Sequence, residues 1–398
     1  MPYVRPRAVI VDIVRTASGK GKPGGALSGT HPAALLGETL RHLVERTGLD
    51  PASVEDVIAG CVGQAADQSL NIARTSLLAA GFPEAVPGTT IDRQCGSSQQ
   101  AVHFAAQAVM AGVHDIVIAG GVESMSRVPM GSASGIAGAE PFAPLADRYP
   151  AGLPHQGIGA EIIAARWKLD RETLDAYSAE SHRRAAAAAG EGLFDREIVP
   201  IALAGGSLHT VDETVRAATT TDGLAALDPA FEDPAFADRF PEIRWAITPG
   251  NSSPLTDAAS AALIMSEEKA VELGLTPRAA IHTMAVTGSD PVLMLTGVIP
   301  ATHKALAIAG LGIDDIDAYE VNEAFAPVPL AWAREFNADP ARLNPRGGAI
   351  ALGHALGASG TRLLATLVNH LENTGGRYGL QTMCEGGGMA NATIIERL

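Results

Sequence analysis

Cys95 stands at a point of the chain where its thiol could be reactive. A short β-prone run ends at Ile91, and Gly96, Ser97 and Ser98 lead from the cysteine into a segment with helical spacing. Near a helix N-terminus, unpaired N–H groups and the helix dipole favour negative charge, which lowers a thiol pKa toward the nucleophilic thiolate. A buried structural cysteine is the alternative, and for a lone cysteine it is the more common case.

Three stretches in the second half of the sequence carry further side chains that could take part in chemistry with this thiol. Asn322 follows a strand-like run, and His354 ends a glycine-rich stretch. Cys384 is followed by one other residue and then by three glycines. Functional side chains of α/β sheets collect at strand ends. Two cysteines and a histidine flanked by glycines could instead indicate a metal site, but zinc prefers more ligands or paired C-x-x-C spacing.

The elements that must position these residues alternate between strand and helix. In the first 120 residues, strands are predicted at 8–14, 54–62, 86–91 and 115–119, and helices at 31–46, 71–80 and 95–111. This alternation predicts a mostly parallel sheet covered by helices on both faces. Cys95 is expected to open the long helix of this half.

The C-terminal part of the chain repeats this order. Strands are predicted at 280–286, 318–321, 380–383 and 391–395, and helices at 300–309, 325–336 and 355–371, while a strand predicted at 258–265 is expected to complete the first sheet. His354 would open the long helix of this half, as Cys95 opens its counterpart. A duplicated architecture of this kind would bring the two helix N-termini close to a shared axis.

The middle of the chain has a different character. Apart from two helices predicted at 159–167 and 171–190, it is rich in loops, glycine and proline, which favours an excursion carrying a binding site over a separate core. The predicted organisation is an N-terminal half formed by 1–120 and 249–270, a loop domain at 121–248, and a C-terminal half at 271–398.

Composition excludes several classes of protein. The 398 residues carry a net charge of −15 with no basic block, which argues against binding to nucleic acid or to an anionic membrane surface. No run of about 18 apolar residues occurs, and no signal sequence is recognised at the start. Three cysteines, Cys61 among them as a buried small side chain, are too few for a disulfide framework. The expected setting is the cytoplasm.

Taken together and in order, these stretches resemble the thiolase family, the acyl-CoA C-acyltransferases. The matching motifs are Gly-Gly-Val-Glu-Ser-Met-Ser (120–126), Thr-Pro-Gly-Asn-Ser-Ser (248–253), Asn-Glu-Ala-Phe-Ala (322–326), Gly-Gly-Ala-Ile-Ala-Leu-Gly-His (347–354) and Cys-Glu-Gly-Gly-Gly-Met (384–389). The form around Cys95 is similar to that of thiolases of actinobacterial fatty-acid and sterol breakdown. The resemblance covers essentially the whole chain and implies the thiolase fold, an α/β arrangement of two similar halves in five layers, α-β-α-β-α.

The resemblance also implies a reaction and its catalytic residues: thiolytic cleavage of a 3-ketoacyl-CoA by CoA, or the reverse Claisen condensation of acetyl-CoA. Cys95 would be the nucleophile that forms an acyl-enzyme, and His354 would be its base. Cys384 would be a second acid/base close to C2 of the acetyl group. One oxyanion hole would combine His354 with a water held by Asn322, and the other would use the N–H groups of Cys95 and Gly386.

Coenzyme A or acyl-CoA would then be a substrate lying over the loop domain, with no tightly bound cofactor and no metal. The resemblance places Ser253 on the pantetheine arm and His155 near the thioester. Arg216 would contact the nucleotide phosphates, or else be a surface arginine in an ion pair. Gln156 borders the expected acyl pocket, and Phe325 would line it, although a core aromatic would show the same pattern.

This family resemblance further implies a homodimer or homotetramer, with the segment 125–139 similar to a loop that some relatives use to pair dimers. Many relatives differ at four positions, which here carry Asp92, Gln156, Arg346 and Ala355, but none of these changes removes a catalytic group. Two other functions remain as alternatives: a non-catalytic lipid-binding protein of the same fold, and a condensing enzyme that uses carrier-protein thioesters. The latter group normally has histidine where this chain has Cys384.

Overall fold

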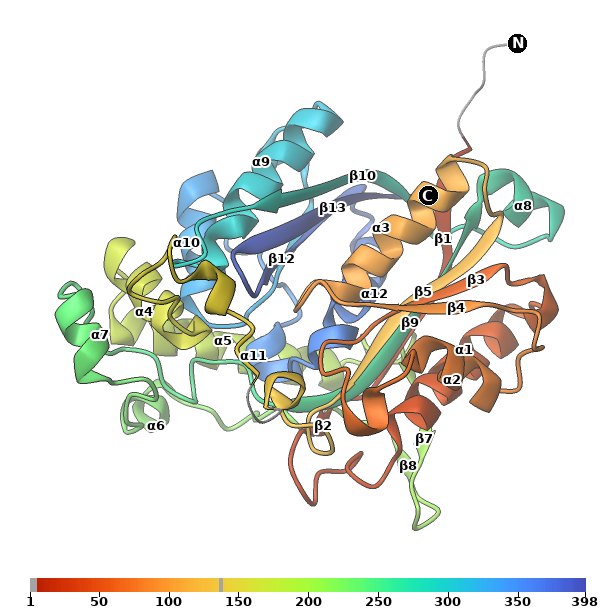
Figure 1. The fold of residues 1–398 in the computed structure, drawn as a ribbon. Coiled ribbons are helices and arrows are strands. Elements are labelled where there is room, and N and C mark those ends of the chain that lie inside the picture. The colour runs from red at the N-terminus through yellow and green to blue at the C-terminus, as the bar shows by residue number, and fades with distance from the viewer. Residues whose placement is uncertain (1–5, 136–138) are drawn as a thin grey trace.

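A bent β-sheet with helices on both sides organises the protein (Figure 1). The computed structural model describes residues 6–135 and 139–398, and within them the sheet has 11 strands. These strands are β1 (Ala8–Thr16), β2 (Gly19–Lys20), β3 (Asp56–Gly60), β4 (Gly88–Ile91), β5 (Ile116–Ser124), β6 (Ile198–Val199), β9 (Thr256–Ser266), β10 (Ala279–Gly288), β11 (Ala318–Val321), β12 (Tyr378–Glu385) and β13 (Met389–Arg397). A separate hairpin pairs β7 (Ile201–Ala202) with β8 (Leu208–His209).

The helices of the described residues fall into three groups. Those associated with the first half of the sheet are α1 (Pro32–Thr47), α2 (Ile72–Ala79), α3 (Ser97–Met110) and α8 (Glu267–Glu272). Those of the middle segment are α4 (Gln156–Arg166), α5 (Arg171–Gly190), α6 (Thr221–Ala225) and α7 (Pro234–Arg239). Those of the second half are α9 (Val298–Ala309), α10 (Pro327–Phe336), α11 (Ala349–Leu352) and α12 (Ser359–Thr374).

The two halves of the sheet have the same strand order. The first runs β1-β9-β5-β3-β4, and the second runs β10-β13-β12-β11, with a parallel bridge between Tyr319 and Leu343 in place of a fifth strand. The halves join where β1 pairs with β10 over two residues. Helices α3 and α12 lie in the angle between the halves, with α1 and α2 outside one and α9 and α10 outside the other (Figure 1). The predicted α/β fold with two similar halves in five layers is therefore confirmed. The expectation of a mostly parallel sheet is wrong, because the central strands β1, β9, β10 and β13 pair antiparallel and, among the described residues, only the outer pairs β3-β4, β3-β5 and β11-β12 and the short β1-β6 pair are parallel.

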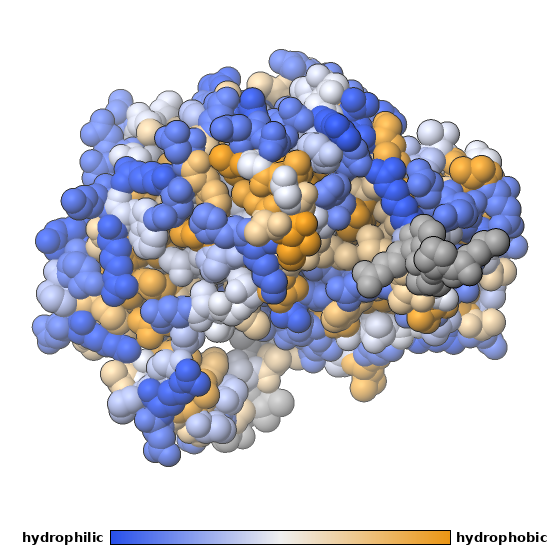
Figure 2. All heavy atoms as spheres, turned by 90° about the horizontal axis from the view of Figure 1, so that it is seen from above, coloured by the Kyte–Doolittle hydropathy of each residue, from blue (hydrophilic) through white to orange (hydrophobic). Residues whose placement is uncertain are grey.

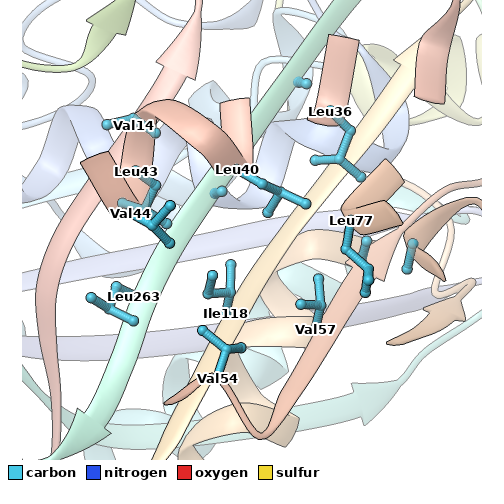
Figure 3. Packing of buried hydrophobic residues seen from close by; sticks show 14 of the residues in the cluster. Val14, Leu36, Leu40, Leu43, Val44, Val54, Val57, Leu77, Ile118 and Leu263 are labelled. Atoms are coloured by element: carbon cyan, nitrogen blue, oxygen red, sulfur yellow. The ribbon is translucent and has the colours of Figure 1, made fainter. Parts of the chain in front are cut away.

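Apolar side chains at helical spacing hold α1 against the first half of the sheet. Leu36, Leu40 and Leu43 recur at intervals of four and three residues, so they lie on one face of the helix (Figure 3). Figure 3 shows this face directed at side chains from four strands, namely Val14, Val57, Ile118 and Leu263. The helix begins after the capping side chain of His31 and ends at Gly48, whose φ of 65° favours glycine.

The two central helices cross at very short range. A Cβ atom on Gly360 of α12 would lie 2.2 Å from the backbone nitrogen of Gln99 in α3, so only glycine fits there. The crossing is also hydrogen-bonded, because the N–H of Thr361 donates to Ser98 Oγ at 3.0 Å. This contact brings the N-terminal ends of α3 and α12 together, as the predicted duplication requires.

The helix predicted at 355–371 is wrong at its start, because α12 begins only at Ser359. A 3₁₀ turn at Leu356–Ala358 precedes it, and Gly353, with φ of 86°, separates His354 from the short helix α11. His354 therefore lies in an extended connection and does not open the helix. Smaller differences concern helix and strand ends, where α3 begins at Ser97 and β5 and β9 extend beyond their predicted ranges.

The middle segment contains the two predicted helices as α4 and α5, and the short helices α6 and α7 in addition. Part of the predicted dimer-pairing loop, residues 136–138, lies outside the described residues. The division of the chain into two halves and a loop domain at 120, 248 and 270 stays a prediction. Within the described ranges, no helix combines the length and apolar character needed to cross a membrane.

Candidate active site

A tight turn between β4 and α3 presents Cys95. Gln94, immediately before it, has φ of 48°, a left-handed conformation that is uncommon outside glycine and that concentrates at functional sites. The Asp92 carboxylate accepts the Gln94 N–H at 2.7 Å, and Ser97 Oγ donates to the Gln94 carbonyl at 2.6 Å. These bonds hold the turn in the conformation that directs Cys95 toward the centre of the molecule.

The Cys95 thiol is buried and is expected to be protonated in the absence of substrate. Burial raises its pKa to about 12, and Glu385, when ionised, acts in the same direction. The backbone N–H groups of Cys95 and Gly386 oppose this shift. The expectation that the helix N-terminus lowers the thiol pKa is therefore wrong, because desolvation outweighs the nearby N–H groups. A base must remove the proton.

His354 is oriented to act as that base. Its Nδ1 lies 2.7 Å from Ser359 Oγ, and the Ser359 hydroxyl donates to the Ala355 carbonyl at 2.8 Å. Since that hydroxyl has given its proton away, Nδ1 is the donor and Nε2 carries the free lone pair. Burial, with a smaller effect from Arg362, lowers the pKa of His354 to about 3, so the ring is neutral near pH 7.

Asn322 joins the histidine to the second cysteine. Its Nδ2 lies 3.4 Å from His354 Nε2, and its side chain acts to lower the pKa of the Cys384 thiol. Asn322 Oδ1 is buried without a partner among the described residues, which fits an acceptor for a bound water. Burial, and then the neighbouring Cys95, raises the pKa of Cys384. The two thiols therefore lie close enough to influence each other.

The glycine turn after β12 closes the site. Gly387 and Gly388 have φ of 80° and 77°, and this left-handed pair turns the chain back into β13. Gly386 packs so closely that a Cβ there would lie 2.8 Å from Gln94 Oε1. The structure thus brings together all five predicted catalytic residues: Cys95, Asn322, His354, Cys384 and Gly386.

Sequence reasoning missed several residues that position this site. Ser359 orients His354, as described above. The Glu123 carboxylate accepts N–H groups from Val62, Gly63 and Gly357, which fastens the turn after His354 to the first half of the sheet. Glu323 has a comparable network with Ser181 and other donors from α5 and the glycine-rich stretch. The sequence could have pointed to Glu123 and Glu323, because they lie inside the motifs 120–126 and 322–326.

The predicted acyl and pantetheine residues lie beside the catalytic group. Ser253 Oγ donates to the carbonyl of Ala324 at 3.1 Å, two residues from Asn322. Phe325 is buried, and its ring lies 6.0 Å from that of Phe231. The Phe231 ring in turn lies 5.3 Å from the His155 ring. Phe231, which sequence reasoning did not single out, therefore connects the predicted residues Phe325 and His155.

Two further predicted binding residues are more peripheral. Arg216 is exposed and, with Lys20 and Ser252, lines a shallow cleft; no ion pair to its guanidinium occurs within the described residues. Gln156 Nε2 lies 3.8 Å from Met130 Sδ. A separate apolar hollow of about 340 Å³ lies within 140–153, lined by residues that include Phe142 and Tyr149, but none of the catalytic candidates borders it. In the described part of the chain, no three His, Cys, Asp or Glu side chains are placed to hold a metal ion.

Comparison with known proteins identifies the class. The model of the thiolase N-terminal domain matches residues 8–268, and that of the thiolase C-terminal domain matches residues 275–397. The chain therefore belongs to the thiolase family. It is an enzyme, an acyl-CoA C-acyltransferase, as its sequence motifs predicted.

Individual relatives are similar over nearly their full length. The steroid 3-ketoacyl-CoA thiolase FadA6 of Mycobacterium tuberculosis is 49% identical over 402 residues, which cover 99% of this chain and 95% of the relative. The 3-ketoacyl-CoA thiolase of Aliivibrio salmonicida is 45% identical over 397 residues, covering 98% and 99%. That of Aliivibrio fischeri is 44% identical over 400 residues, again covering 98% and 99%.

Proposed function

We propose that this enzyme cleaves 3-ketoacyl-CoA by thiolysis, or condenses acetyl-CoA in reverse, through an acyl group carried on Cys95. The observation that carries the proposal is the convergence of two buried thiols, an imidazole and an amide from four separate segments. Those segments are the turn before α3, the end of β11, the connection before α12 and strand β12. The relatives named 3-ketoacyl-CoA thiolase support this substrate class.

The first half-reaction forms the acyl-enzyme. Cys95 gives its proton to His354 Nε2, and its sulfur attacks the C3 carbonyl of the substrate. The resulting oxyanion accepts hydrogen bonds from the N–H groups of Cys95 and Gly386, the same groups that act to lower the pKa of the resting thiol. The C2–C3 bond then breaks, its electron pair moves to the departing acetyl-CoA, and Cys384 protonates C2. His354, now a cation, lies beside the enolate oxygen.

The second half-reaction returns every group to its starting state. The CoA thiol gives its proton to the Cys384 thiolate, and the CoA sulfur attacks the acyl group on Cys95. The Cys95 sulfur leaves and takes the proton from His354. A lone donor in an oxyanion hole typically contributes about 10²–10³-fold to the rate.

The substrate would supply its own coenzyme A, so the proposed reaction needs no tightly bound cofactor. Arg216 adds positive charge at a cleft of this acidic protein, where Lys20 is paired with Glu213, and this charge suits the phosphates of the nucleotide. Ser253 lies next to Phe325, which suits the pantetheine arm and the acyl chain respectively. Because the mechanism needs Cys95 and Cys384 as free thiols, we assign the enzyme to the reducing cytoplasm.

The decisive test is the site of acylation. Incubation with acetyl-CoA, followed by intact-mass and peptide analysis, is expected to show one acetyl group on Cys95. The Cys95→Ala variant is expected to show none. Acetyl on Cys61 or Cys384, with Cys95 unmodified, would contradict the assignment. Steady-state comparison of acetoacetyl-CoA with medium-chain and sterol-side-chain 3-ketoacyl-CoA esters then identifies the preferred acyl group.

A further inference from the structure

Glu385 is a buried carboxylic acid at the centre of the site that the mechanism above does not use. It is the last residue of β12 and stands between Cys384 and Gly386. Its exposed fraction is 0%, yet neither carboxyl oxygen finds a hydrogen-bond donor among the residues that the structure describes. A fully buried acid without partners is costly for the folded state unless it has a function or bound water.

The carboxyl group lies directly against the backbone that carries the nucleophile. A Cβ atom built on Gly96 would stand 2.0 Å from Glu385 Oε1, so the acid occupies the space of a side chain at the residue after Cys95. Asn391 lies in the same place, and its Nδ2 donates to the Gly96 carbonyl at 3.0 Å. Glu385 is thus held in contact with the turn that presents Cys95, opposite a fixed amide.

The charged and titratable groups around Glu385 are few. Arg93 and Asp92 face it from the turn before α3, Cys384 precedes it on its own strand, and Cys95 is its neighbour across Gly96. Burial raises the pKa of Glu385 to about 8, against a smaller lowering by Arg93. Burial is the largest cause of the raised pKa of Cys95, and Glu385 is the second largest. Two acids this close cannot both ionise freely, since like charges repel at low dielectric.

We propose that Glu385 is a positioning residue that acts through Cys95: while its carboxyl keeps its proton the thiolate can form, and once that proton is lost the thiolate is suppressed. During acylation the Cys95 proton goes to His354 and Glu385 keeps its own, so no additional group is consumed. The proposal rests on the assigned role of Cys95 for its catalytic meaning. The thiol itself, however, can be titrated without any assumption about the reaction.

The test is alkylation of Cys95 by iodoacetamide between pH 6 and 10, in the wild type and in Glu385→Gln, with the modified peptide identified by mass spectrometry. Glutamine keeps the shape of the side chain but cannot ionise. The expected rate ratio, variant to wild type, is near one at pH 6–7 and grows above pH 8 to about three- to tenfold, which corresponds to a pKa difference of up to about one unit. A ratio that does not change with pH would overturn the proposal.

Glu320→Gln is the matched control. Glu320 is also buried with both oxygens unpartnered, and burial raises its pKa to about 8, but it is not among the main charges that act on Cys95. The ratio of its Cys95 alkylation rate to that of the wild type is expected to stay constant between pH 6 and 10. If this ratio grew with pH as much as the ratio for Glu385→Gln, the proposal would also be overturned.

The wild type alone decides the matter if Glu385→Gln does not fold. The rate of Cys95 alkylation must then rise less steeply with pH above about pH 8 than below it. A rate profile without that change of slope counts against the proposal. Acetyl mapping in the wild type is independent of this result. An acetyl group on another cysteine would refute the proposed mechanism while leaving the measured coupling between Glu385 and Cys95 intact.

Discussion

At the scale of residues, the site separates two cysteines by their surroundings. Cys95 lies on a turn where two backbone N–H groups act to lower the pKa of its thiol, whereas Cys384 lies at the end of a strand where the Asn322 side chain acts in the same way on its own thiol. His354 is the imidazole between them, with its ring direction set by Ser359. The same thiol chemistry can therefore serve as nucleophile in one place and as proton donor in the other.

This separation predicts different defects for two variants. Cys384→Ser is still expected to accept an acetyl group on Cys95, because the attack uses His354 and the N–H groups, and the departing CoA thiolate is a stable anion that can leave without a proton from Cys384. Its turnover in thiolysis and condensation is expected to fall steeply, since a hydroxyl with a pKa far above 7 is a poor acid/base. His354→Ala is expected to slow the acylation itself. Burst-phase acylation and steady-state turnover, measured on both variants, distinguish the two roles.

If Cys384→Ser blocked acylation as fully as Cys95→Ala does, this division of roles would be wrong. The control is Cys61→Ser, which changes a buried cysteine that the mechanism does not use. Both its acylation and its turnover are expected to stay close to those of the wild type, apart from any loss of stability.

Ser359 provides a second prediction at this scale. Its hydroxyl accepts the Nδ1 proton of His354, so Ser359→Ala removes the group that fixes the tautomer with a free Nε2. We expect kcat to fall about tenfold, the equivalent of one ordinary hydrogen bond of about 1.4 kcal/mol. Ser359→Thr keeps a hydroxyl and should retain more activity than Ser359→Ala. Equal losses in both variants would indicate a packing effect instead of an orienting one.

At the scale of elements, the site depends on how closely α3 and α12 approach each other. Cys95 precedes one of these helices and His354 precedes the other, so their separation follows from the crossing at Gly360 and Gln99. Gln381 Nε2 donates to the Gly360 carbonyl at 2.7 Å and ties the same point to β12, which carries Cys384. One crossing therefore sets the relative positions of all three reactive side chains.

Gly360→Ala tests this dependence. The added methyl group would meet the Gln99 backbone at 2.2 Å, and backbone cannot move aside as a flexible side chain can. We expect a loss of about 1–3 kcal/mol in the free energy of unfolding, typical of overpacking, and a marked fall in kcat. Chemical denaturation and steady-state kinetics measure the two effects.

The matched control for this substitution is Gly190→Ala in α5. Nothing lies within 4 Å of a Cβ built on Gly190, and its φ is not positive. Alanine there is expected to be neutral or to stabilise by about 0.4–1 kcal/mol, with activity unchanged. A Gly360→Ala protein as stable and active as this control would show that the crossing tolerates a wider spacing.

At the scale of the whole molecule, the surface indicates association between copies. In the view from above in Figure 2, hydrophilic side chains dominate the rim while apolar side chains gather in patches near the middle. Other large apolar residues project into solvent from the middle segment, with Phe142 67% exposed and Met130 54% exposed. Apolar patches bordered by polar residues commonly mark protein–protein contacts.

We therefore predict a homodimer or homotetramer in solution, in agreement with the state that the family resemblance implies. Light scattering at micromolar concentration is expected to give two or four times the 40.9 kDa of one chain. A Phe142→Ser variant indicates whether the exposed middle segment contributes: a smaller assembly is expected if it does. A monomer in the wild type at this concentration would refute the prediction.

Sequence alone was enough for the class of fold, the family and a set of candidate catalytic residues that the structure places together. Strand and helix periodicity located most elements because each needs only local side-chain spacing, and β11 was predicted at its observed bounds. The five catalytic positions followed from short motifs, Cys-Gly-Ser-Ser and Asn-Glu-Ala-Phe among them, that remain recognisable without any coordinates.

Only the tertiary structure decided how those residues behave. Local pattern indicated a lowered pKa for Cys95, but burial and the approach of Glu385 raise it, because desolvation depends on groups far away in the chain. His354 was expected to open a helix, yet close packing around the Gly357 turn places that helix five residues later. The contact between Glu385 and Gly96 joins residues 289 positions apart, and no spacing rule within one element can predict such a contact.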